Sequence, residues 1–214
     1  MKFEAELVEI LPHDLPQRDL VIQKASGHLD RIVAANEYMN LTRITTPREA
    51  AIKHVLDSLI PWRLFADARK VLDAGTGPGF PGIPLAIVLP ETRFLLAESI
   101  QKKARFVDSV LTQLGLSNAS ISAARAEELG RDGGIDIITA RALAPITRVL
   151  GLFAKQLKSG AKILLYKGPD AEREIADSGK EAARLGVGMK VVMRYDLPDA
   201  MGSRVVVEIV KRTG

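Results

Sequence analysis

The stretch V-L-D-A-G-T-G-P-G-F-P-G-I-P, residues 71–84, decides the predicted fold. Val71 and Leu72 are typical of the end of a buried strand, and the apolar run that resumes at Ile83 is typical of a helix. The turn between them contains Gly75, Gly77, Gly79 and Gly82. Glycine lets the main chain approach a ligand closely, and the first N–H groups of a helix have no intrahelical partners. The stretch therefore predicts a strand, turn and helix suited to a nucleotide-like ligand.

Three interpretations of this turn are open from its residues alone. Counted from Gly77, the spacing is G-x-G-x-x-G, which is typical of dinucleotide-binding proteins. Counted from Asp73, it is acidic-x-G-x-G-x-G, which is typical of methyltransferases that use S-adenosylmethionine. A tight turn that binds no ligand is the third interpretation.

Length and composition limit the classes of protein. A chain of 214 residues, 47% of them hydrophobic, predicts one domain with a sizeable core. It has no cysteine, which excludes disulfides, thiolate metal sites and a cysteine nucleophile. His13, His28 and His54 are far apart and lack partners at metal-ligand spacing, so no metal site is expected.

The net charge of +4 and the pI of about 9.4 permit an anionic partner such as RNA. Residues 1–10 mix acidic with apolar side chains, unlike a signal peptide. No apolar run reaches the length that spans a membrane. We therefore expect a cytoplasmic protein without a membrane partner.

The first third of the chain is predicted to be helical. One helix is expected over 15–36, with His28 at its surface or half-buried. A second is expected over 46–60, begun by a capping box of Thr46 and Glu49. In that helix the spacing of three polar residues gives them one shared face, which is either solvated or the wall of a substrate cleft: His54, Asp57 and Ser58.

From Lys70 onward, strands alternate with helices, which predicts a mostly parallel sheet. The strands are expected at 70–74, 93–97, 119–123, 135–140, 162–166, 190–195 and 204–210. The helical segments between them are expected at 83–89, 101–114, 125–129, 144–157 and 170–185. Since no helix fits between the last two strands, they are predicted to form an antiparallel hairpin. We expect a helical extension, 1–65, packed on a core domain, 66–214.

The hairpin and the short chain favour a methyltransferase over a dinucleotide-binding domain with its separate substrate domain. Glu98 follows the second strand, where its carboxylate can accept hydrogen bonds from ribose hydroxyls. It supports a nucleoside ligand but does not separate NAD from S-adenosylmethionine. No Walker lysine follows the glycines, which disfavours nucleoside triphosphate hydrolysis.

The run G-T-G-P-G-F-P-G-I-P at 75–84 resembles that of the bacterial 16S rRNA guanine-N7 methyltransferases, the glucose-inhibited division protein B family. The resemblance extends from Asn40 to Gly168 and includes shorter blocks on both sides. These blocks are Asn40-Leu41-Thr42, His54-Val55-Leu56-Asp57-Ser58, Glu98-Ser99, Lys102-Lys103, Arg125-Ala126-Glu127-Glu128, Arg141-Ala142 and Lys167-Gly168.

The resemblance implies a Rossmann-like α/β fold, S-adenosylmethionine as cofactor, and 16S rRNA as partner, in the small subunit or its precursor, for a monomeric enzyme. The cofactor residues it implies are Gly75, Gly77 and Phe80 for the methionine part, Glu98 for the ribose, Ala126 and Glu127 for the adenine, and Arg141. Arg141 would also orient the entering base. The candidate RNA-contacting residues are Asn40, Arg43, His54, Asp57, Ser58, Lys102, Lys103 and Lys167.

The chemistry of guanine N7 suits this chain. N7 carries an in-plane lone pair and no proton, so methyl transfer needs orientation but no general base. Consistent with this, the fourth strand is followed by R-A-L-A-P, residues 141–145, and not by the Asn/Asp-Pro-Pro-aromatic block of amine methyltransferases. Methylation of another substrate, a non-catalytic binding module and an NAD-dependent oxidoreductase are the alternatives.

Basic residues predict a rim that contacts RNA phosphates, although scattered solvated charge is an equally simple interpretation. These residues are Arg43, Arg48, Lys53, Arg63, Lys102, Lys103, Arg141, Arg148 and Lys167.

Overall fold

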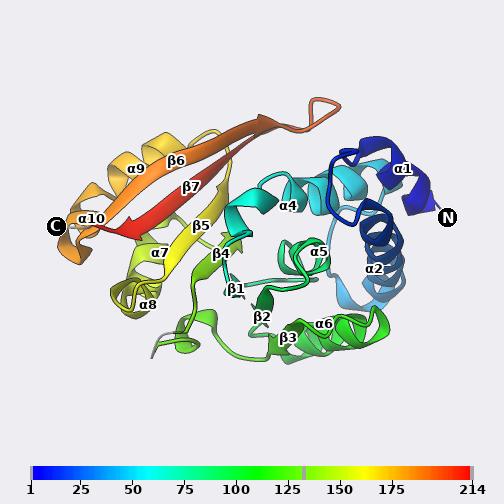
Figure 1. The fold of residues 1–214 in the computed structure, drawn as a ribbon, viewed down its shortest axis with the longest axis horizontal. Helices are drawn as coiled ribbons and strands as arrows, with labels where there is room; N and C mark the ends of the chain where they lie inside the picture. Colours follow the sequence, from blue (N-terminus) through cyan, green and yellow to red (C-terminus); the bar gives the residue numbers. More distant parts are fainter. Residues whose placement is uncertain (1, 132–133, 213–214) are drawn as a thin grey trace.

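The computed structural model describes residues 2–131 and 134–212, and its centre is a seven-stranded sheet in the order β3-β2-β1-β4-β5-β7-β6 (Figure 1). The strands are β1 (Lys70–Ala74), β2 (Arg93–Ala97), β3 (Ala119–Ser122), β4 (Ile137–Arg141), β5 (Lys162–Lys167), β6 (Val187–Asp196) and β7 (Ser203–Lys211). The first five strands run parallel, and β7 is antiparallel to both β5 and β6. The predicted mostly parallel α/β sheet with a C-terminal hairpin is confirmed.

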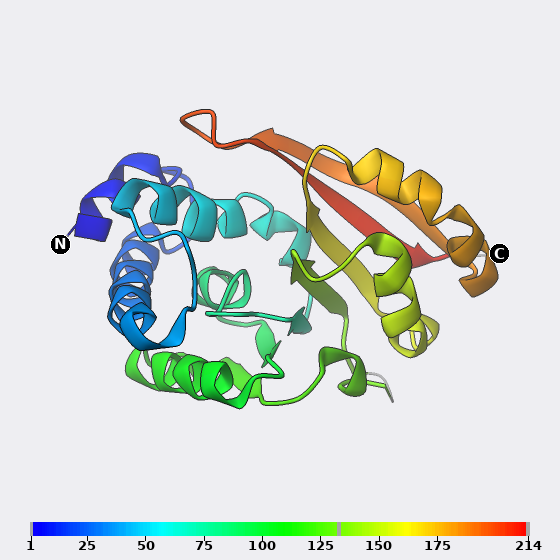
Figure 2. The same ribbon diagram turned by 180° about the vertical axis from the view of Figure 1, so that it is seen from behind.

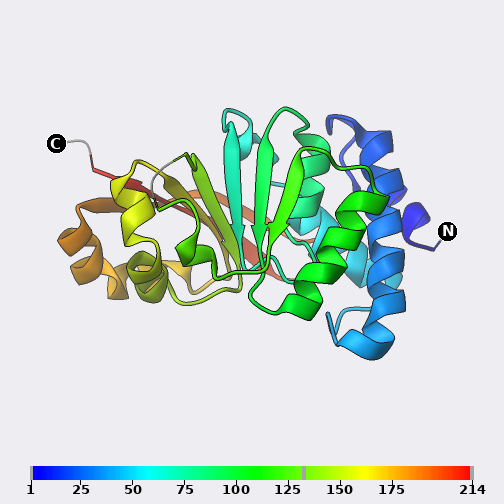
Figure 3. The ribbon, with the colours of Figure 1, turned by 90° about the horizontal axis from the view of Figure 1, so that it is seen from below.

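Helices cover both faces of the sheet (Figure 3). One layer contains α1 (Lys2–Ile10), α2 (Arg18–Met39), α3 (Pro47–Ala50), α4 (Asp57–Leu59), α5 (Gly82–Val88) and α6 (Gln101–Gln113). The other contains α7 (Ile146–Leu152), α8 (Ala154–Lys158), α9 (Ala171–Asp177) and α10 (Gly179–Leu185). Short 3₁₀ turns lie at Trp62–Phe65 and Ala126–Glu128.

Alternating strand residues point into two separate cores. Val71 and Phe94 join the core that contains the N-terminal helices, including Leu7 and Leu29. Leu72 faces the other core, beneath α7 and α8. Since successive side chains of a strand point to opposite faces, apolar residues at consecutive positions of β1 predict a strand buried on both sides. The N-terminal helices thus share one hydrophobic core with the sheet.

The helix expected over 46–60 differs most from its prediction. Between α3 and α4 the chain forms a π-helix, Ala51–Leu56, in which Asp57 N donates to the carbonyl of Ile52, five residues back. The predicted capping box is wrong, because Thr46 makes no side-chain cap hydrogen bond and Glu49 pairs with Lys53 instead. A π-turn is wider than an α-turn and is frequent at functional sites.

Two other predicted helices are each divided. The segment 144–157 breaks at Phe153, which is buried between α7 and α8. The segment 170–185 breaks at Ser178, whose hydroxyl donates to the carbonyl of Glu174 and lies 2.9 Å from the Thr147 hydroxyl. In both cases side-chain packing against neighbouring elements outweighs the continuous helical period of the sequence.

The β6–β7 hairpin extends beyond the sheet toward the N-terminal helices (Figures 1 and 2). Arg48 Nε donates to Asp199 in the hairpin loop at 2.8 Å, and Arg48 Nη1 pairs with Glu6 and Glu9 of α1. Arg48 therefore links α1 to the loop of the β6–β7 hairpin. Within the described residues, no helix is both long and apolar enough to cross a membrane.

Candidate active site at the carboxyl edge of the sheet

Three adjoining cavities lie where the parallel strands end. The Glu98 cavity, of about 260 Å³, is lined by Gly75, Glu98 and Ala126 among others. The His54 cavity, of about 160 Å³, lies on the other side of Gly75 and is also lined by Arg141. The third, the Lys167 cavity of about 530 Å³, shares Arg141 and His54 with the second. Ligands of open α/β sheets bind at this edge, so the three cavities form the candidate active site.

The glycine turn is held by a buried carboxylate. Asp73 is fully buried, and its Oδ2 accepts hydrogen bonds from Thr76 Oγ1 at 2.6 Å and from Gly82 N at 2.8 Å. Burial raises the pKa of Asp73 to about 6, although both of these hydrogen bonds act in the opposite direction. Gly75 has a φ of 71°, and a Cβ there would lie 2.8 Å from Leu143 Cδ1. The main chain at Gly75 thus lines the cavity with no side chain in between.

Glu98 lies at the end of β2, as its sequence position predicts. Its side chain is mostly buried, and Oε1 accepts from Ile100 N at 2.9 Å. In the described part of the chain, Oε2 makes no hydrogen bond, which leaves an acceptor beside the cavity. Ala126 and Glu127 line the same cavity from the 3₁₀ turn after β3. The fold therefore brings these residues to Gly75.

Phe80 is stacked between two buried histidines. Its ring centroid lies 4.7 Å from that of His28 and 4.7 Å from that of His54. His28 Nε2 lies 2.7 Å from the carbonyl of Pro78, and His54 Nε2 lies 3.1 Å from Thr42 Oγ1. The prediction that His28 is a surface or half-buried residue is wrong, because its side chain is fully buried against the glycine turn. This contact is invisible in the local sequence of α2.

Burial keeps both histidines neutral. It lowers the pKa of His28 to about 4, and burial with the nearby Arg141 charge lowers the pKa of His54 to about 3. An uncharged ring can stack on Phe80 without placing a buried cation in the core. The stack therefore fixes the glycine turn against α2 and the π-helix by packing and not by charge.

Stability should fall as pH decreases from about 6.5 to 4.5. Below pH 6.5 the unfolded chain protonates His28 and His54, whereas the folded chain does so only near pH 4 and 3. Asp73 acts in the opposite sense, since its folded pKa of about 6 exceeds 3.8. In this range the unfolded chain binds two histidine protons that the folded chain lacks, and the folded chain binds one Asp73 proton that the unfolded chain lacks. The net difference of one proton lowers the free energy of unfolding by about 1 kcal/mol for each pH unit of acidification.

Urea unfolding between pH 6.5 and 4.5 measures this change in the free energy of unfolding. His28→Gln should reduce the slope, whereas the exposed-site control His13→Gln should keep it; a flat wild-type profile would contradict the assignment.

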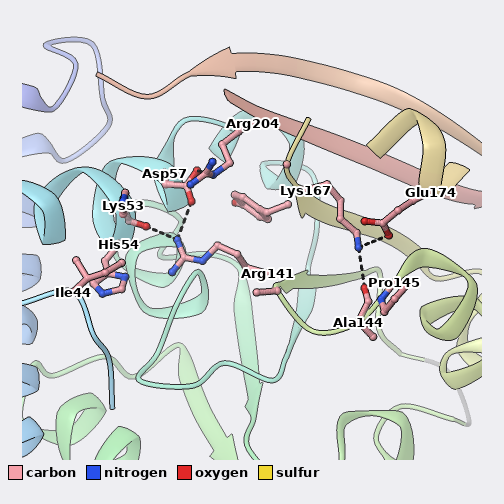
Figure 4. Close-up of a pocket in the computed structure, with 13 residues that line it drawn as sticks. Ile44, Lys53, His54, Asp57, Arg141, Ala144, Pro145, Lys167, Glu174 and Arg204 are labelled. Carbon is pink, nitrogen blue, oxygen red and sulfur yellow. Dashed lines mark hydrogen bonds and ion pairs between the residues drawn. The ribbon is translucent and has the colours of Figure 1, made fainter. Parts of the chain in front are cut away.

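Asp57 organises the boundary between the His54 and Lys167 cavities (Figure 4). Arg141 Nη1 donates to Asp57 Oδ2 at 3.0 Å and to the carbonyl of Lys53 at 2.7 Å. On Asp57 Oδ1, Tyr195 Oη donates at 2.9 Å and Arg204 Nε lies at 3.5 Å. Lys53, whose carbonyl accepts from Arg141, lies within the π-helix Ala51–Leu56. Arg141 is therefore oriented through one nitrogen, Nη1.

The solvated interpretation of the helix face at 54–58 is wrong. His54, Asp57 and Ser58 are all buried. His54 and Asp57 line cavities, whereas Ser58 is fully enclosed, with its hydroxyl donating to the carbonyl of His54. Tyr166 Oη in turn donates to the carbonyl of Ser58 at 2.9 Å. Ser58 is therefore enclosed by its neighbours and lines none of the three cavities.

The remaining predicted RNA residues occupy different environments. Lys167 lines the third cavity, where its Nζ donates to Ala144 O at 2.8 Å and to Glu174 Oε2 at 2.7 Å. Lys102 is exposed, and its Nζ donates to the carbonyl of Tyr38 and lies 5.5 Å from the centroid of that ring. The others lie at the surface: Asn40 and Arg43 are exposed, and Lys103 is half-buried.

Five members of the predicted basic rim pair with acids, among them Arg141 with Asp57 and Lys167 with Glu174. Arg48 pairs with three carboxylates, as described above. Lys53 pairs with Glu49, and Arg63 pairs with Asp14. Arg148 is exposed beside the Glu98 cavity. The predicted rim therefore carries less unpaired charge than its sequence indicates, because sequence cannot show which basic side chains find acidic partners.

Sequence reasoning missed three residues that line or support the site. Tyr195 and Arg204 reach Asp57 from the hairpin, and Glu174 reaches the Lys167 cavity from α9. No local sequence motif identifies these residues as part of a site, because the hairpin and α9 are recognised in the sequence only by their strand and helix patterns. Within the described ranges, no group of His, Cys, Asp or Glu side chains is arranged to hold a metal ion.

The fold is that of the S-adenosylmethionine-dependent methyltransferases. The O-methyltransferase TomG from Streptomyces achromogenes, solved in complex with SAM, superimposes with a TM-score of 0.58 at 19% identity, over 86% of this chain and 90% of that chain. Cofactor-bound Rv0187 from MTB superimposes with a TM-score of 0.59 at 18% identity, over 95% of this chain and 100% of that chain.

Sequence comparison defines the family within this class. Residues 21–197 match the family described as rRNA small subunit methyltransferase G. A protein of that name from Solibacter usitatus is 60% identical over 98% of this chain and 100% of its own length. Another from Sorangium cellulosum is 42% identical over 74% of this chain and 69% of its own length. The chain belongs to the rRNA small subunit methyltransferase G family.

Proposed function

We propose that this protein transfers a methyl group from S-adenosylmethionine to N7 of a guanine in 16S rRNA. The observation that carries the proposal is that neighbouring cavities share lining residues. The Glu98 cavity shares Gly75 with the His54 cavity, which shares His54 and Arg141 with a larger cavity. That larger cavity is lined by four basic side chains, each paired with an acidic residue, whose remaining N–H donors suit a nucleotide of an anionic RNA. They are Lys53, Arg141, Lys167 and Arg204.

The residues present fit the cofactor. A Cβ at Gly75 would lie 2.8 Å from Leu143 Cδ1, so a side chain there would crowd Leu143 and the cavity that Gly75 lines. Glu98 Oε2 is an acceptor for ribose hydroxyls. Gly77 and Phe80 line the His54 cavity, on the side proposed for the methionine part. Ala126 and Glu127 are proposed to contact the adenine.

The chemistry requires orientation and charge placement from the protein. Bound S-adenosylmethionine supplies an electrophilic methyl group, which the N7 lone pair of guanine accepts without losing a proton. Arg141 is proposed to orient the base with the nitrogens that its Asp57 and Lys53 contacts leave available. Asp57 holds Arg141, and the neutral His54 ring supports Phe80 beside it. No residue is required to act as a general base.

The wider arrangement is also part of the proposal. The substrate is 16S rRNA in the small subunit or its precursor, and the enzyme acts as a monomer in the cytoplasm. Residues 1–65 form a helical extension of a core domain, 66–214. The residues proposed to contact RNA directly are Asn40, Arg43, Lys102, Lys103 and Lys167. His54 and Asp57 are proposed to form the cavity walls around the bound nucleotide, and Ser58 supports these walls from behind.

Transfer of a labelled methyl group tests the function. The purified protein is incubated with labelled S-adenosylmethionine and either naked 16S rRNA, small subunits or total protein. The expected product is N7-methylguanosine in 16S rRNA, identified by mass spectrometry after digestion to nucleosides. Label in protein or in another nucleoside would place the enzyme on a different substrate. Tight NAD binding without S-adenosylmethionine binding would overturn the methyltransferase assignment.

A further inference from the structure

The Lys167 cavity contains two carboxylates, and they differ in their spare hydrogen-bonding capacity. Both oxygens of Asp57 have partners, namely Arg141 on Oδ2 with Tyr195 and Arg204 on Oδ1. Glu174 uses only Oε2, which accepts from Lys167 Nζ at 2.7 Å and from Ile146 N at 2.9 Å. Glu174 Oε1 makes no hydrogen bond within the described ranges, and the side chain is 30% exposed. One cavity carboxylate is thus held in place with an acceptor left over.

The position of Glu174 follows from three elements that meet at this wall. Its helix, α9, places it beside the start of α7, whose first main-chain N–H it accepts. Lys167 at the end of β5 bridges Glu174 to the carbonyl of Ala144. Figure 4 shows this cluster and the Asp57–Arg141 cluster at separate places around the cavity. A carboxylate fixed by two donors loses little side-chain entropy when a ligand binds, which favours recognition.

Guanine has a feature that matches this acceptor. N7 lies on the edge of the five-membered ring, so a guanine with N7 toward the Arg141 side turns its Watson–Crick edge away from that side. That edge presents N1–H and the 2-amino group as donors, whereas adenine presents an acceptor at N1 and no 2-amino group. An ionised carboxylate accepts from guanine and repels adenine at the same place.

We propose that Glu174 selects guanine by accepting hydrogen bonds from N1–H and the 2-amino group of the target base. The inference rests on the proposed function and adds a specificity-determining residue to it. It also has a kinetic consequence. As the N7–methyl bond forms and the methyl–sulfur bond of S-adenosylmethionine breaks, positive charge passes from sulfur to the purine and neutral S-adenosylhomocysteine leaves. No proton is lost, so N1–H and the 2-amino group become stronger donors. Their bonds to Glu174 strengthen in the transition state, which raises kcat and not only affinity.

Glu174→Gln is the informative variant. A glutamine oxygen can still accept from Lys167 Nζ and Ile146 N, but its amide then directs a donor toward the base. We expect kcat/KM for the rRNA to fall about 10- to 100-fold, mainly through kcat, with unchanged affinity for S-adenosylmethionine. The matched control is Glu172→Gln on the same helix, because exposed Glu172 pairs with Arg194 and does not line the cavity. It should methylate normally.

An altered base separates recognition from structural damage. Once the methylated guanine is located, 16S rRNA is prepared with inosine there, which keeps N7 and N1–H but lacks the 2-amino group. We expect inosine to lower kcat/KM of the wild type about tenfold and that of Glu174→Gln little further. Equilibrium binding of both RNAs in the presence of S-adenosylhomocysteine should show the same pattern. Inosine should weaken binding to the wild type and have little further effect on binding to Glu174→Gln.

Equal inosine penalties in the wild type and in Glu174→Gln would overturn the role of Glu174, and so would full activity of the variant. Those outcomes leave the methyltransferase itself intact. A wild-type protein that methylates no guanine N7 in any rRNA substrate would instead overturn the proposed function. Thermal unfolding of Glu174→Gln within about 2 °C of the wild type excludes a folding defect as the cause of lost activity.

Discussion

Gly75→Val is expected to abolish binding of S-adenosylmethionine. Gly75 has a φ of 71°, and a Cβ there meets Leu143 Cδ1 at 2.8 Å. The two methyl groups of valine would extend further, into the junction of the Glu98 and His54 cavities that Gly75 lines. A β-branched residue in the left-handed region also adds about 1–2 kcal/mol of strain. Calorimetric titration should show a loss of affinity of at least about 100-fold.

Gly115→Val is the control for backbone strain. Gly115 has a φ of 60°, close to that of Gly75, but a Cβ there meets nothing within 4 Å, and the residue follows α6 away from the cavities. This variant should lose some stability and retain the wild-type affinity for the cofactor. If Gly75→Val binds S-adenosylmethionine as the wild type does, the ligand does not lie against this main chain.

Asp57→Asn should both destabilise the protein and inactivate it. Only 2% of the Asp57 side chain is exposed, and its carboxylate faces two arginines, Arg141 and Arg204. Removing one partner of a buried ion pair costs about 3–5 kcal/mol. For a chain of this size that corresponds to a fall in Tm of roughly 10 °C. Release of Arg141 from its fixed position should lower kcat about 100-fold.

The matched control is Asp14→Asn. Asp14 also pairs with an arginine, Arg63, at 3.2 Å, but both side chains are largely exposed. Exposed pairs contribute about 0–1 kcal/mol, so Tm and turnover should stay close to the wild type. Thermal denaturation and steady-state kinetics of both variants measure the difference. Wild-type turnover in Asp57→Asn would mean that the orientation of Arg141 does not depend on this carboxylate.

The sheet and the glycine turn follow from local features of the sequence. Strand β2, Arg93–Ala97, has its predicted bounds, because a short apolar run between turn residues leaves few alternatives. Glu98 follows directly from the end of that strand, so its place at the sheet edge needed no tertiary information. The hairpin was predictable for a similar reason: two strands without an intervening helix can pair only in the antiparallel sense.

Only the tertiary structure decided how the second half of the site is assembled. Asp57 meets Arg141 across 84 residues and Tyr195 across 138, and no local pattern encodes such pairs. His28 and the Lys53 carbonyl likewise meet partners distant in sequence, Phe80 and Arg141. Hydrophobic periodicity and turn chemistry act over a few residues, whereas the pairing of buried polar groups depends on which elements pack together. That is why the place of Gly75 and Glu98 at the sheet edge could be predicted from sequence and the Asp57 and Glu174 clusters could not.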